Sequence, residues 1–310
     1  MDVVCLGILV ADVIARPLDE PAPGGSLALL DEITLHGGGC ALNTASVLAT
    51  LGAEAAVVGK VGADPFGDFL LGLLDARAVR REGVVRDARV PTSATVVLVD
   101  SVGERTFLHV PGANGALRVD ELDEGVVYAG RSLHLAGALV MEGLDGEPFA
   151  RVAEEARRRG IRTSLDPVWD PTGRWSRLEP CLPHLDLVTS SLVEGRALTG
   201  EKDPARVAAW LHDRGVPEVC LTMGAGGCYA SGDGFAGRVA APAVNVVDST
   251  GAGDAFAAGL IHGRLSGRLL EEAARLGCAA GALATTAVGA TEGVAGLDEV
   301  LALAGLDESG

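Results

Sequence analysis

The chain has 310 residues, 48% of them hydrophobic, which is enough to bury the core of one large domain and excludes a disordered chain. Its formal net charge of −17 repels nucleic acid and anionic membranes, so we expect neither as a general partner. The start lacks the pattern of a signal peptide, and the six cysteines lack zinc-binding spacing, so we expect reduced thiols in a cytoplasmic protein.

Short apolar runs alternate with helical patterns along the chain. The runs predict strands, and the stretches between them predict helices. In chain order, the predicted strands are Val3–Ile8, Ala55–Val58, Ser132–Leu135, Arg162–Leu165, Asp186–Thr189 and Glu218–Thr222. The predicted helices are Ala41–Leu51, Phe66–Ala76, Pro148–Arg159, Val193–Leu198, Pro204–Asp213 and Asp254–Arg264. This alternation predicts an α/β fold with a doubly wound, mostly parallel sheet and helices on both faces.

Two segments interrupt the alternation. Prolines and a Gly-Gly pair precede a β-like run at Leu29–Leu35, and residues 92–110 predict a hairpin that turns at Ser101–Glu104. Together they predict a small separate β-sheet that acts as a lid over the main domain. An ordinary antiparallel edge of the main sheet is the alternative, which the pattern leaves open. The predicted boundaries are 12–36 and 91–110 for the lid, and 1–11, 37–90 and 111–310 for the main domain.

The longest uncharged stretch near the C-terminus is Leu276–Thr291. It is short for a membrane span and is interrupted by glycines and threonines. We therefore expect a buried helix there and no membrane segment.

Residues 246–256, with the sequence VVDSTGAGDAF, lead from an apolar run through small residues into a predicted helix. Small residues allow successive backbone N–H groups to point into one concavity, and the start of a helix adds positive potential, so the segment suits phosphate oxygens. Asp254 lies in the first turn, where its carboxylate can take the proton of an attacking hydroxyl. An ordinary first-turn acid after a tight Gly-x-Gly turn is the alternative.

A second glycine-rich segment, HGGGCALNTA, covers residues 36–45. Glycines let a ligand approach the backbone, and Asn43 offers a donor and an acceptor, so the segment suits binding of hydroxyls; a helix-cap role for Asn43 is the alternative. Asp12 follows the first strand, Cys5–Leu9, at the edge where open α/β sheets bind ligands. A solvated loop acid explains Asp12 equally well.

Missing motifs argue against three other classes of enzyme. The His-Gly-Gly-Gly string resembles the oxyanion loop of lipases, but no serine lies in a Gly-x-Ser-x-Gly sequence. No Gly-x-x-x-x-Gly-Lys-Ser/Thr loop occurs, and no Gly-x-Gly-x-x-Gly follows the first strand. Walker-type nucleotide binding and a Rossmann dehydrogenase are therefore set aside.

Together the motifs resemble those of the ribokinase-like (pfkB) carbohydrate kinases. Asp248–Phe256 resembles the C-terminal signature of that family, and Gly37–Asn43 followed by Gly59–Gly67 resembles the N-terminal one. Further matches in family order are Gly7–Asp12, Gly112–Asn114, Thr189–Gly200 and Leu221–Gly224. The resemblance covers nearly the whole chain. It implies a ribokinase-like fold and ATP- and Mg²⁺-dependent phosphorylation of a hydroxyl, expected to be primary, of a small sugar or sugar-like molecule.

The resemblance also implies a role for each matching residue. Asp254 would be the general base, and Gly251, Ala252 and Gly253 would form the anion hole. The sugar would contact Asp12, Gly38, Gly39 and Asn43. The nucleotide would contact Ser191, Thr222, Gly224, Gly227, Gly251 and Gly253, with the stretch Cys278–Gly289 beside the adenine. Glu194 would organise Mg²⁺ through water, and Asp248 corresponds to a ligand of a monovalent cation in some members, which raises potassium as a further cofactor.

Two positions depart from the family pattern. Ser191 replaces the asparagine of the usual Asn-x-x-Glu, which affects one phosphate or water contact. Cys40 stands where ribokinases and the phosphofructokinase branch commonly have lysine, which argues against both narrower assignments. A phosphorylated sugar would need a further cation, for which Arg105 in the lid hairpin is the candidate.

Two alternative functions and one partner stay open. A nucleoside kinase of the same fold would present a ribose to Asp12 and Asn43. A non-catalytic sugar or nucleotide sensor would keep the fold without the reaction. The resemblance also implies a homodimer through the exposed strands of the lid as a partner to consider, which the residues themselves do not decide.

Overall fold

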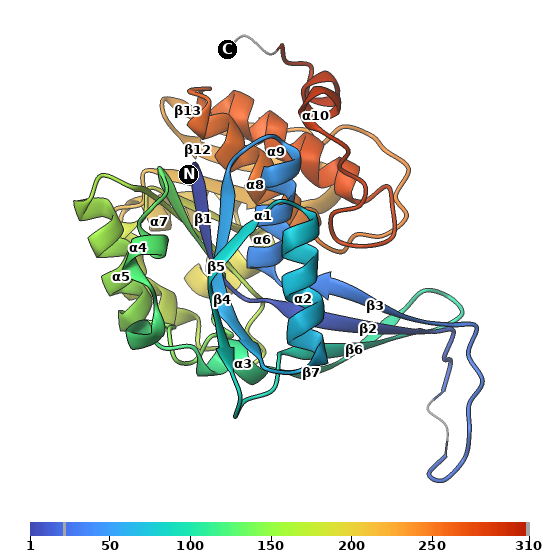
Figure 1. Ribbon diagram of the computed structural model, residues 1–310. Coiled ribbons are helices and arrows are strands. Elements are labelled where there is room, and N and C mark those ends of the chain that lie inside the picture. The colour runs from blue at the N-terminus through green and yellow to red at the C-terminus, as the bar shows by residue number, and fades with distance from the viewer. Residues whose placement is uncertain (21–22, 308–310) are drawn as a thin grey trace.

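The computed structural model describes residues 1–20 and 23–307. Its centre is a nine-stranded sheet in the order β13-β12-β11-β10-β9-β8-β1-β4-β5, and a second sheet of four strands lies beside it (Figure 1). The strands of the large sheet are β1 (Val3–Gly7), β4 (Ala55–Gly62), β5 (Arg80–Asp87), β8 (Ser132–Ala138), β9 (Arg162–Pro167), β10 (Leu187–Ser191), β11 (Glu218–Thr222), β12 (Cys228–Gly232) and β13 (Phe235–Val239).

The seven neighbouring strands β11, β10, β9, β8, β1, β4 and β5 run parallel to one another, and β12 and β13 add an antiparallel edge beside β11. β1 lies between β4 and β8, and the chain builds the sheet outward from β1 first on one side and then on the other. The strand order therefore reverses at β1. In open α/β sheets, ligands bind outside the carboxyl ends of the strands at such a point.

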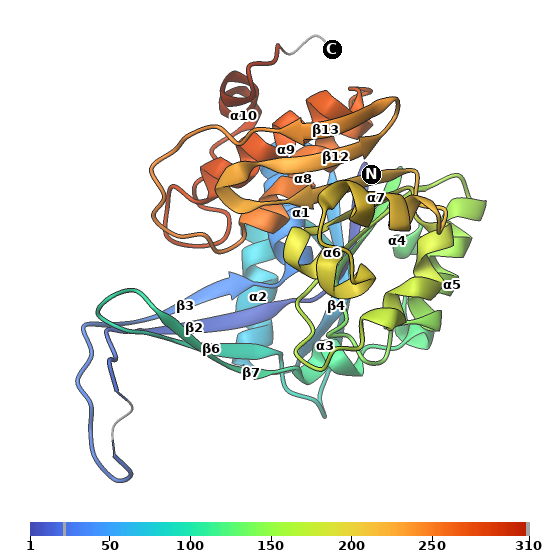
Figure 2. The ribbon, with the colours of Figure 1, turned by 180° about the vertical axis from the view of Figure 1, so that it is seen from behind.

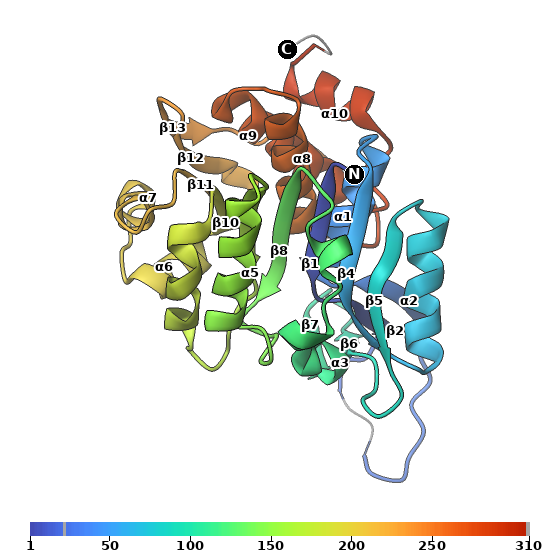
Figure 3. The same ribbon diagram turned by 60° about the vertical axis from the view of Figure 1, so that its left-hand side comes forward.

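Helices cover both faces of the large sheet, as the alternation of strands and helices predicts (Figure 3). Along β1, Val3 and Cys5 pack into one hydrophobic cluster, whereas Val4 and Leu6 pack into the other. The helices of the first cluster are α1 (Cys40–Thr50), α2 (Pro65–Ala76), α8 (Ala252–Leu265), α9 (Leu270–Ala284) and α10 (Leu297–Ala304). Those of the second cluster include α4 (Glu124–Val127), α5 (Glu147–Arg158), α6 (Leu192–Thr199), α7 (Pro204–His212) and the 3₁₀ helix η2 (Trp175–His184). Shorter helical turns are α3 (Gly112–Ala116), η1 (Val119–Glu121) and η3 (Gly224–Gly226).

The second sheet has the order β3-β2-β6-β7 and projects from the main body near α2 (Figures 1 and 2). Its strands are β2 (Val10–Arg16), β3 (Glu32–Gly38), β6 (Ala94–Val99) and β7 (Arg105–Val110). The prediction of a small separate sheet is confirmed, and the alternative of an ordinary edge of the main sheet is wrong. Residues 21–22 of the predicted lid lie outside the described residues.

Asp12 lies in the small sheet, within the predicted lid segment 12–36. The chain passes from the large sheet to the small one at Leu9, and Asp12 lies within β2 rather than in a loop after the first strand. The Asn114 side chain holds this crossing, because it accepts a hydrogen bond from Leu9 N at 3.1 Å and donates one to Leu9 O at 2.8 Å.

The predicted strands and helices are all present, although several elements were not predicted. β5 and the antiparallel pair β12–β13 were missed, and α9 begins and ends before the predicted buried stretch Leu276–Thr291 does. Within the described residues, no helix combines the length and the apolarity needed to cross a membrane.

Candidate active site

The site begins at the N-terminus of α8. Gly251 precedes this helix in the left-handed conformation, with φ of 74°, and a Cβ there would lie 2.2 Å from the carbonyl oxygen of Ala290. Only glycine fits that position. A Cβ on Gly253, in contrast, would meet nothing within 4 Å, because this residue faces a cavity. Gly251 has no side chain to cap α8, which leaves the positive end of the helix open to an anion.

Asp254 lies in the first turn of α8 and is 9% exposed. Asn43 Nδ2, in the first turn of α1, donates a hydrogen bond of 2.7 Å to Asp254 Oδ2. Burial raises the pKa of the Asp254 carboxyl, and the hydrogen bond from Asn43 opposes this shift. The carboxylate is therefore more basic than an exposed aspartate, which suits a group that accepts a proton.

The other atom of the Asn43 amide is unpartnered. Asn43 is 4% exposed, and its Oδ1 has no hydrogen-bond partner among the described residues. A buried acceptor without a donor is rare in folded proteins.

Asp12 lies against the glycines that precede α1. A Cβ on Gly38 would be 2.1 Å from Asp12 Oδ2, and one on Gly39, whose φ is 92°, would be 2.5 Å from the carbonyl oxygen of Ile8. The two glycines thus allow the small sheet and β1 to approach the start of α1. Burial raises the pKa of Asp12 to about 6, although Thr95 and His36 act in the opposite direction.

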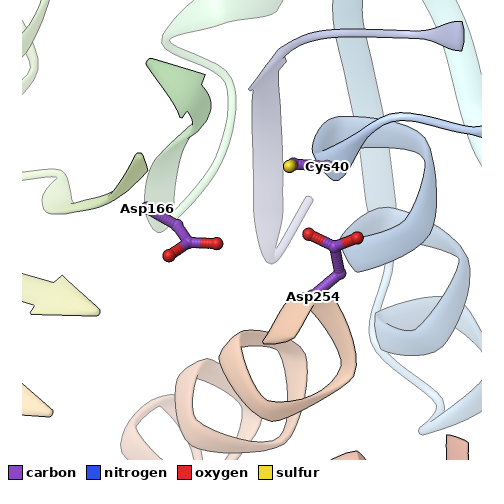
Figure 4. Close-up of side chains that lie close together, drawn as sticks. All are labelled: Cys40, Asp166 and Asp254. Carbon is purple, nitrogen blue, oxygen red and sulfur yellow. The ribbon is translucent and has the colours of Figure 1, made fainter. Parts of the chain in front are cut away.

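A further acid, Asp166, was missed in the sequence. It is the last residue but one of β9 and lies beside Cys40 and Asp254, and Figure 4 shows the three side chains pointing toward one another. One possible ligand atom from each lies within 4.8 Å of the others. Burial raises the pKa of Asp166 well above its usual range, and the carboxylates of Glu194 and Asp254 add to this shift. The sequence did contain a signal for Asp166, because this acid directly follows the predicted strand Arg162–Leu165. An acid in that position lies at the carboxyl edge of the sheet, where ligands bind.

Ser191 and Glu194 form a capping box at the start of α6. Glu194 Oε2 accepts hydrogen bonds from the backbone N–H of Ser191 at 2.8 Å and from its hydroxyl at 2.6 Å. Burial raises the pKa of Glu194, and these hydrogen bonds oppose the shift. Serine at position 191 therefore fixes the carboxylate of Glu194.

Two cavities meet at the start of α8. One, of about 350 Å³, is lined by acidic groups that include Asp166, Glu194 and Asp254. The other, of about 570 Å³, is mostly apolar, and it shares Thr222 and Gly253 with the first. A long ligand with an apolar end and an anionic end could therefore occupy both. Carboxylate oxygens are the ligands that Mg²⁺ prefers, so the acidic cavity fits a magnesium ion that accompanies the anionic end.

Glycines shape the larger cavity where β11 turns back into β12. Gly224 has a φ of 57°, and Gly227 has a φ of 81°. A Cβ on Gly227 would be 2.0 Å from the carbonyl oxygen of Val239. Both residues line the cavity together with Thr222 and Cys278, and a nucleotide site there stays a prediction.

Asp248 lies on the loop that leads to the start of α8. Its Oδ1 accepts hydrogen bonds from the Thr250 N–H at 2.9 Å and from Arg105 Nη2 at 2.7 Å, and its Oδ2 accepts one from Gly289 N at 3.2 Å. Burial opposes ionisation of Asp248, but these hydrogen bonds outweigh it and lower its pKa to about 2. The two predicted residues Arg105 and Asp248 are thus joined as an ion pair.

The remaining predicted residues fall into three groups at the carboxyl edge of the sheet. Those beside the start of α1 are Asp12, Gly38, Gly39 and Asn43. Those around the acidic cavity are Ser191, Glu194, Gly251, Ala252, Gly253 and Asp254. Those of the apolar cavity are Thr222, Gly224 and Gly227. The hydrogen bond from Asn43 to Asp254 joins the first group to the second.

Comparison with known proteins places this arrangement in a family. The sequence model for the pfkB family of carbohydrate kinases matches residues 1–295. A fructokinase from Klebsiella pneumoniae is 35% identical over 267 residues, which are 82% of this chain and 87% of that protein. The structure of a fructokinase with bound ATP from Xylella fastidiosa matches with a TM-score of 0.81 and 27% identity over 97% of both chains. A ribokinase from Arabidopsis thaliana, complexed with ribose and ATP, shares the fold with a TM-score of 0.83 and 24% identity over 99% of both chains. The chain belongs to the pfkB family of carbohydrate kinases.

Proposed function

We propose that the chain transfers the γ-phosphoryl group of ATP to a hydroxyl, expected to be primary, of a small sugar or sugar-like molecule. The observation that carries this proposal is the hydrogen bond of 2.7 Å between Asn43 and Asp254 at the open end of α8. It brings a buried base, a sugar-binding amide and an anion site together. Such a site needs to position the reactants and to stabilise charge on the transferring group.

The residues divide the chemical work as follows. Asp254 accepts the proton of the sugar hydroxyl as the hydroxyl oxygen bonds to the γ-phosphorus, while the bond from that phosphorus to the bridging oxygen of ADP breaks. The N–H groups of residues 251–253 stabilise the negative charge on the transferring group. Mg²⁺ neutralises phosphate charge when bound, and Asp166 and Glu194 would hold it, Glu194 through water.

The sugar is proposed to lie between the small sheet and α1. Asp12 would accept its hydroxyl donors, Asn43 would contact a further hydroxyl, and Gly38 and Gly39 leave room for the Asp12 carboxylate and the end of β1 beside α1. We propose an unphosphorylated sugar, because a sugar phosphate would have to compete with Asp248 for Arg105. The name of the Klebsiella relative makes fructose the first sugar to test.

The direct test measures ADP production from Mg-ATP with a panel of ketoses, aldoses, keto-deoxy acids and nucleosides. Phosphorus NMR of the product then identifies the hydroxyl that was phosphorylated. We expect turnover with a sugar and its loss in Asp254→Asn. Turnover with nucleosides alone would instead establish a nucleoside kinase. Calorimetric binding of ATP and sugar without any ADP production would identify a sensor and refute the proposal.

Magnesium and potassium have separate tests. Glu194→Gln and Asp166→Asn are each expected to raise the Mg²⁺ concentration needed for half-maximal turnover. Potassium at Asp248 stays a prediction, and a cation there would share the carboxylate with Arg105. Turnover in potassium and in tetramethylammonium chloride at equal ionic strength measures that dependence.

We further propose a homodimer through the small sheet. All six residues of β7 are exposed, and the exposed apolar side chains of this sheet include Ile33, Phe107 and Leu108. Light scattering after gel filtration should give twice the chain mass for the wild type and the single mass for Phe107→Ser/Leu108→Ser. A wild-type monomer would refute this. The compartment proposed is the cytoplasm, which suits the six free cysteines.

A further inference from the structure

Arg105 is the first residue of β7 in the small sheet, yet its guanidinium binds the loop before α8. Nη2 donates a hydrogen bond of 2.7 Å to Asp248 Oδ1, and Nη1 donates one of 2.9 Å to Thr250 Oγ1. The Asp248 side chain is 9% exposed and that of Arg105 is 31% exposed. The bond to Asp248 joins two charged, partly buried groups and is therefore of the stronger kind of hydrogen bond, and the bond to Thr250 adds a second point of attachment.

The loop bound by Arg105 shapes the anion hole. Asp248 accepts hydrogen bonds from the Thr250 N–H and hydroxyl, and its own N–H donates to the carbonyl oxygen of Thr285. Gly251 follows directly and begins α8. Any change in the position of the Asp248 carboxylate would therefore move the N–H groups offered to a phosphate. Loss of the guanidinium would also leave an uncompensated negative charge in this loop, where a phosphate must bind.

The same small sheet carries the sugar-binding acid Asp12. In register, Asp12 on β2 pairs with Thr95 on β6, and Thr95 pairs with His109 on β7. Arg105 and Asp12 therefore belong to one hydrogen-bonded sheet. A movement of this sheet toward a sugar held by Asp12 would carry Arg105 toward the Asp248 loop.

We propose that Arg105 is a positioning residue that couples the small sheet to the anion-binding loop. The ion pair holds residues 248–251 in their phosphate-binding shape when the sheet lies over the site, and it releases them when the sheet moves away. The catalytic part of this inference rests on the proposed kinase function. Phosphoryl transfer would then be efficient only after a sugar has drawn the sheet into place, which limits hydrolysis of ATP by water.

Hydrogen exchange tests the coupling without any need for turnover. Arg105→Gln should speed amide exchange in both the 246–256 segment and the β6–β7 hairpin. The matched control is Arg16→Gln, which breaks another ion pair of the same sheet, with Glu32, away from the loop. The control should leave exchange in the 246–256 segment unchanged. Equal exchange in that segment for Arg105→Gln and the wild type would overturn the proposal.

Kinetics test the catalytic consequence. Arg105→Gln should lower kcat roughly 10- to 100-fold, the range expected for one lost hydrogen bond between charged groups. It should also raise the ratio of ATP hydrolysis without sugar to phosphorylation with sugar, a ratio that Arg16→Gln leaves unchanged. Arg105→Lys, which keeps the charge, should recover part of kcat. Added to Asp248→Asn, Arg105→Gln should cause little further loss.

The two experiments separate failure of the inference from failure of the proposed function. Faster exchange in Arg105→Gln, with no turnover by the wild type on any acceptor, would leave the coupling standing and refute the kinase reaction. Normal turnover with an unchanged hydrolysis ratio in Arg105→Gln would refute the coupling and leave the kinase standing.

Discussion

Asp254→Asn is expected to lower activity without lowering stability. Burial makes the Asp254 carboxylate a better base, but it also makes its ionisation destabilise the folded chain. The asparagine keeps the shape of the side chain and can still accept the hydrogen bond from Asn43 through its amide oxygen. It cannot accept the proton of the sugar hydroxyl. Loss of a positioned general base costs roughly 10²- to 10⁴-fold in rate, or about 3–5 kcal/mol of transition-state stabilisation.

The stability of the same variant should not fall. Burial raises the pKa of Asp254 in the folded chain above the value of 3.8 that an unperturbed aspartate has. As pH rises from this lower pKa through the raised one, the unfolded chain loses the proton first, so ionisation destabilises the folded state. Above the raised pKa this penalty is complete. Asp254→Asn removes it and should unfold at the same temperature as the wild type or at a higher one, with the difference shrinking toward pH 4.

Two measurements and one control decide this prediction. The assays are the steady-state rate of ADP production and the midpoint of thermal unfolding, both at pH 7. The control is Asp68→Asn, because Asp68 is also a first-turn acid, in α2, but its side chain is exposed. It should keep its activity. A loss of stability in Asp254→Asn that matches its loss of activity would refute the assignment of Asp254 as a base, since the carboxylate would then be structural.

Three further predictions concern the sugar and phosphate positions. Gly38→Ala would place a Cβ 2.1 Å from Asp12 Oδ2 and displace this carboxylate. The loss of one charged hydrogen bond should raise the KM for sugar roughly 10-fold or more, while the KM for ATP stays unchanged. The control is Gly72→Ala, because a Cβ there would have no neighbour within 4 Å. Because the pKa of Asp12 is about 6, the KM for sugar should rise as pH falls through 6, and a flat profile would contradict a role for its carboxylate. Gly253→Ala has room for its methyl group, so its thermal midpoint should be retained while the methyl enters the phosphate cavity and lowers kcat; undiminished kcat would argue against an anion hole there.

The centre of the fold could be predicted from the sequence because its strands are buried on both faces. β1, β4 and β8 are buried throughout, and most of their residues are apolar or glycine. β5 was missed because it forms an edge of the sheet and carries exposed charges, such as Arg80 and Arg86. β12 and β13 were missed for a similar reason, because these strands at the other edge of the sheet contain small and polar residues and form no apolar run.

The candidate site was predictable where its residues lie close together in the sequence. Gly39 and Gly251, which both have a positive φ, each precede a helix of the site. Asp254 lies in the first turn of the helix that follows Gly251. Asp166 joins these groups only because the carboxyl end of β9 lies at the same edge of the sheet. The ion pair between Arg105 and Asp248 could not be read from the sequence, because the two residues are 143 positions apart and belong to different sheets or loops.

The small sheet is built from two segments that are far apart in the chain, and this dictates when it can fold. Its strand β2 pairs with β6, with Ala11 opposite Ala94, and α1, β4, α2 and β5 lie between them in sequence. Long loops make such pairings slow, because the entropy of closing the loop opposes them until the intervening elements are packed. Asp254 arrives later still along the chain. A nascent chain on the ribosome therefore has every strand of its large sheet before Asp254, the proposed base, can reach a sugar.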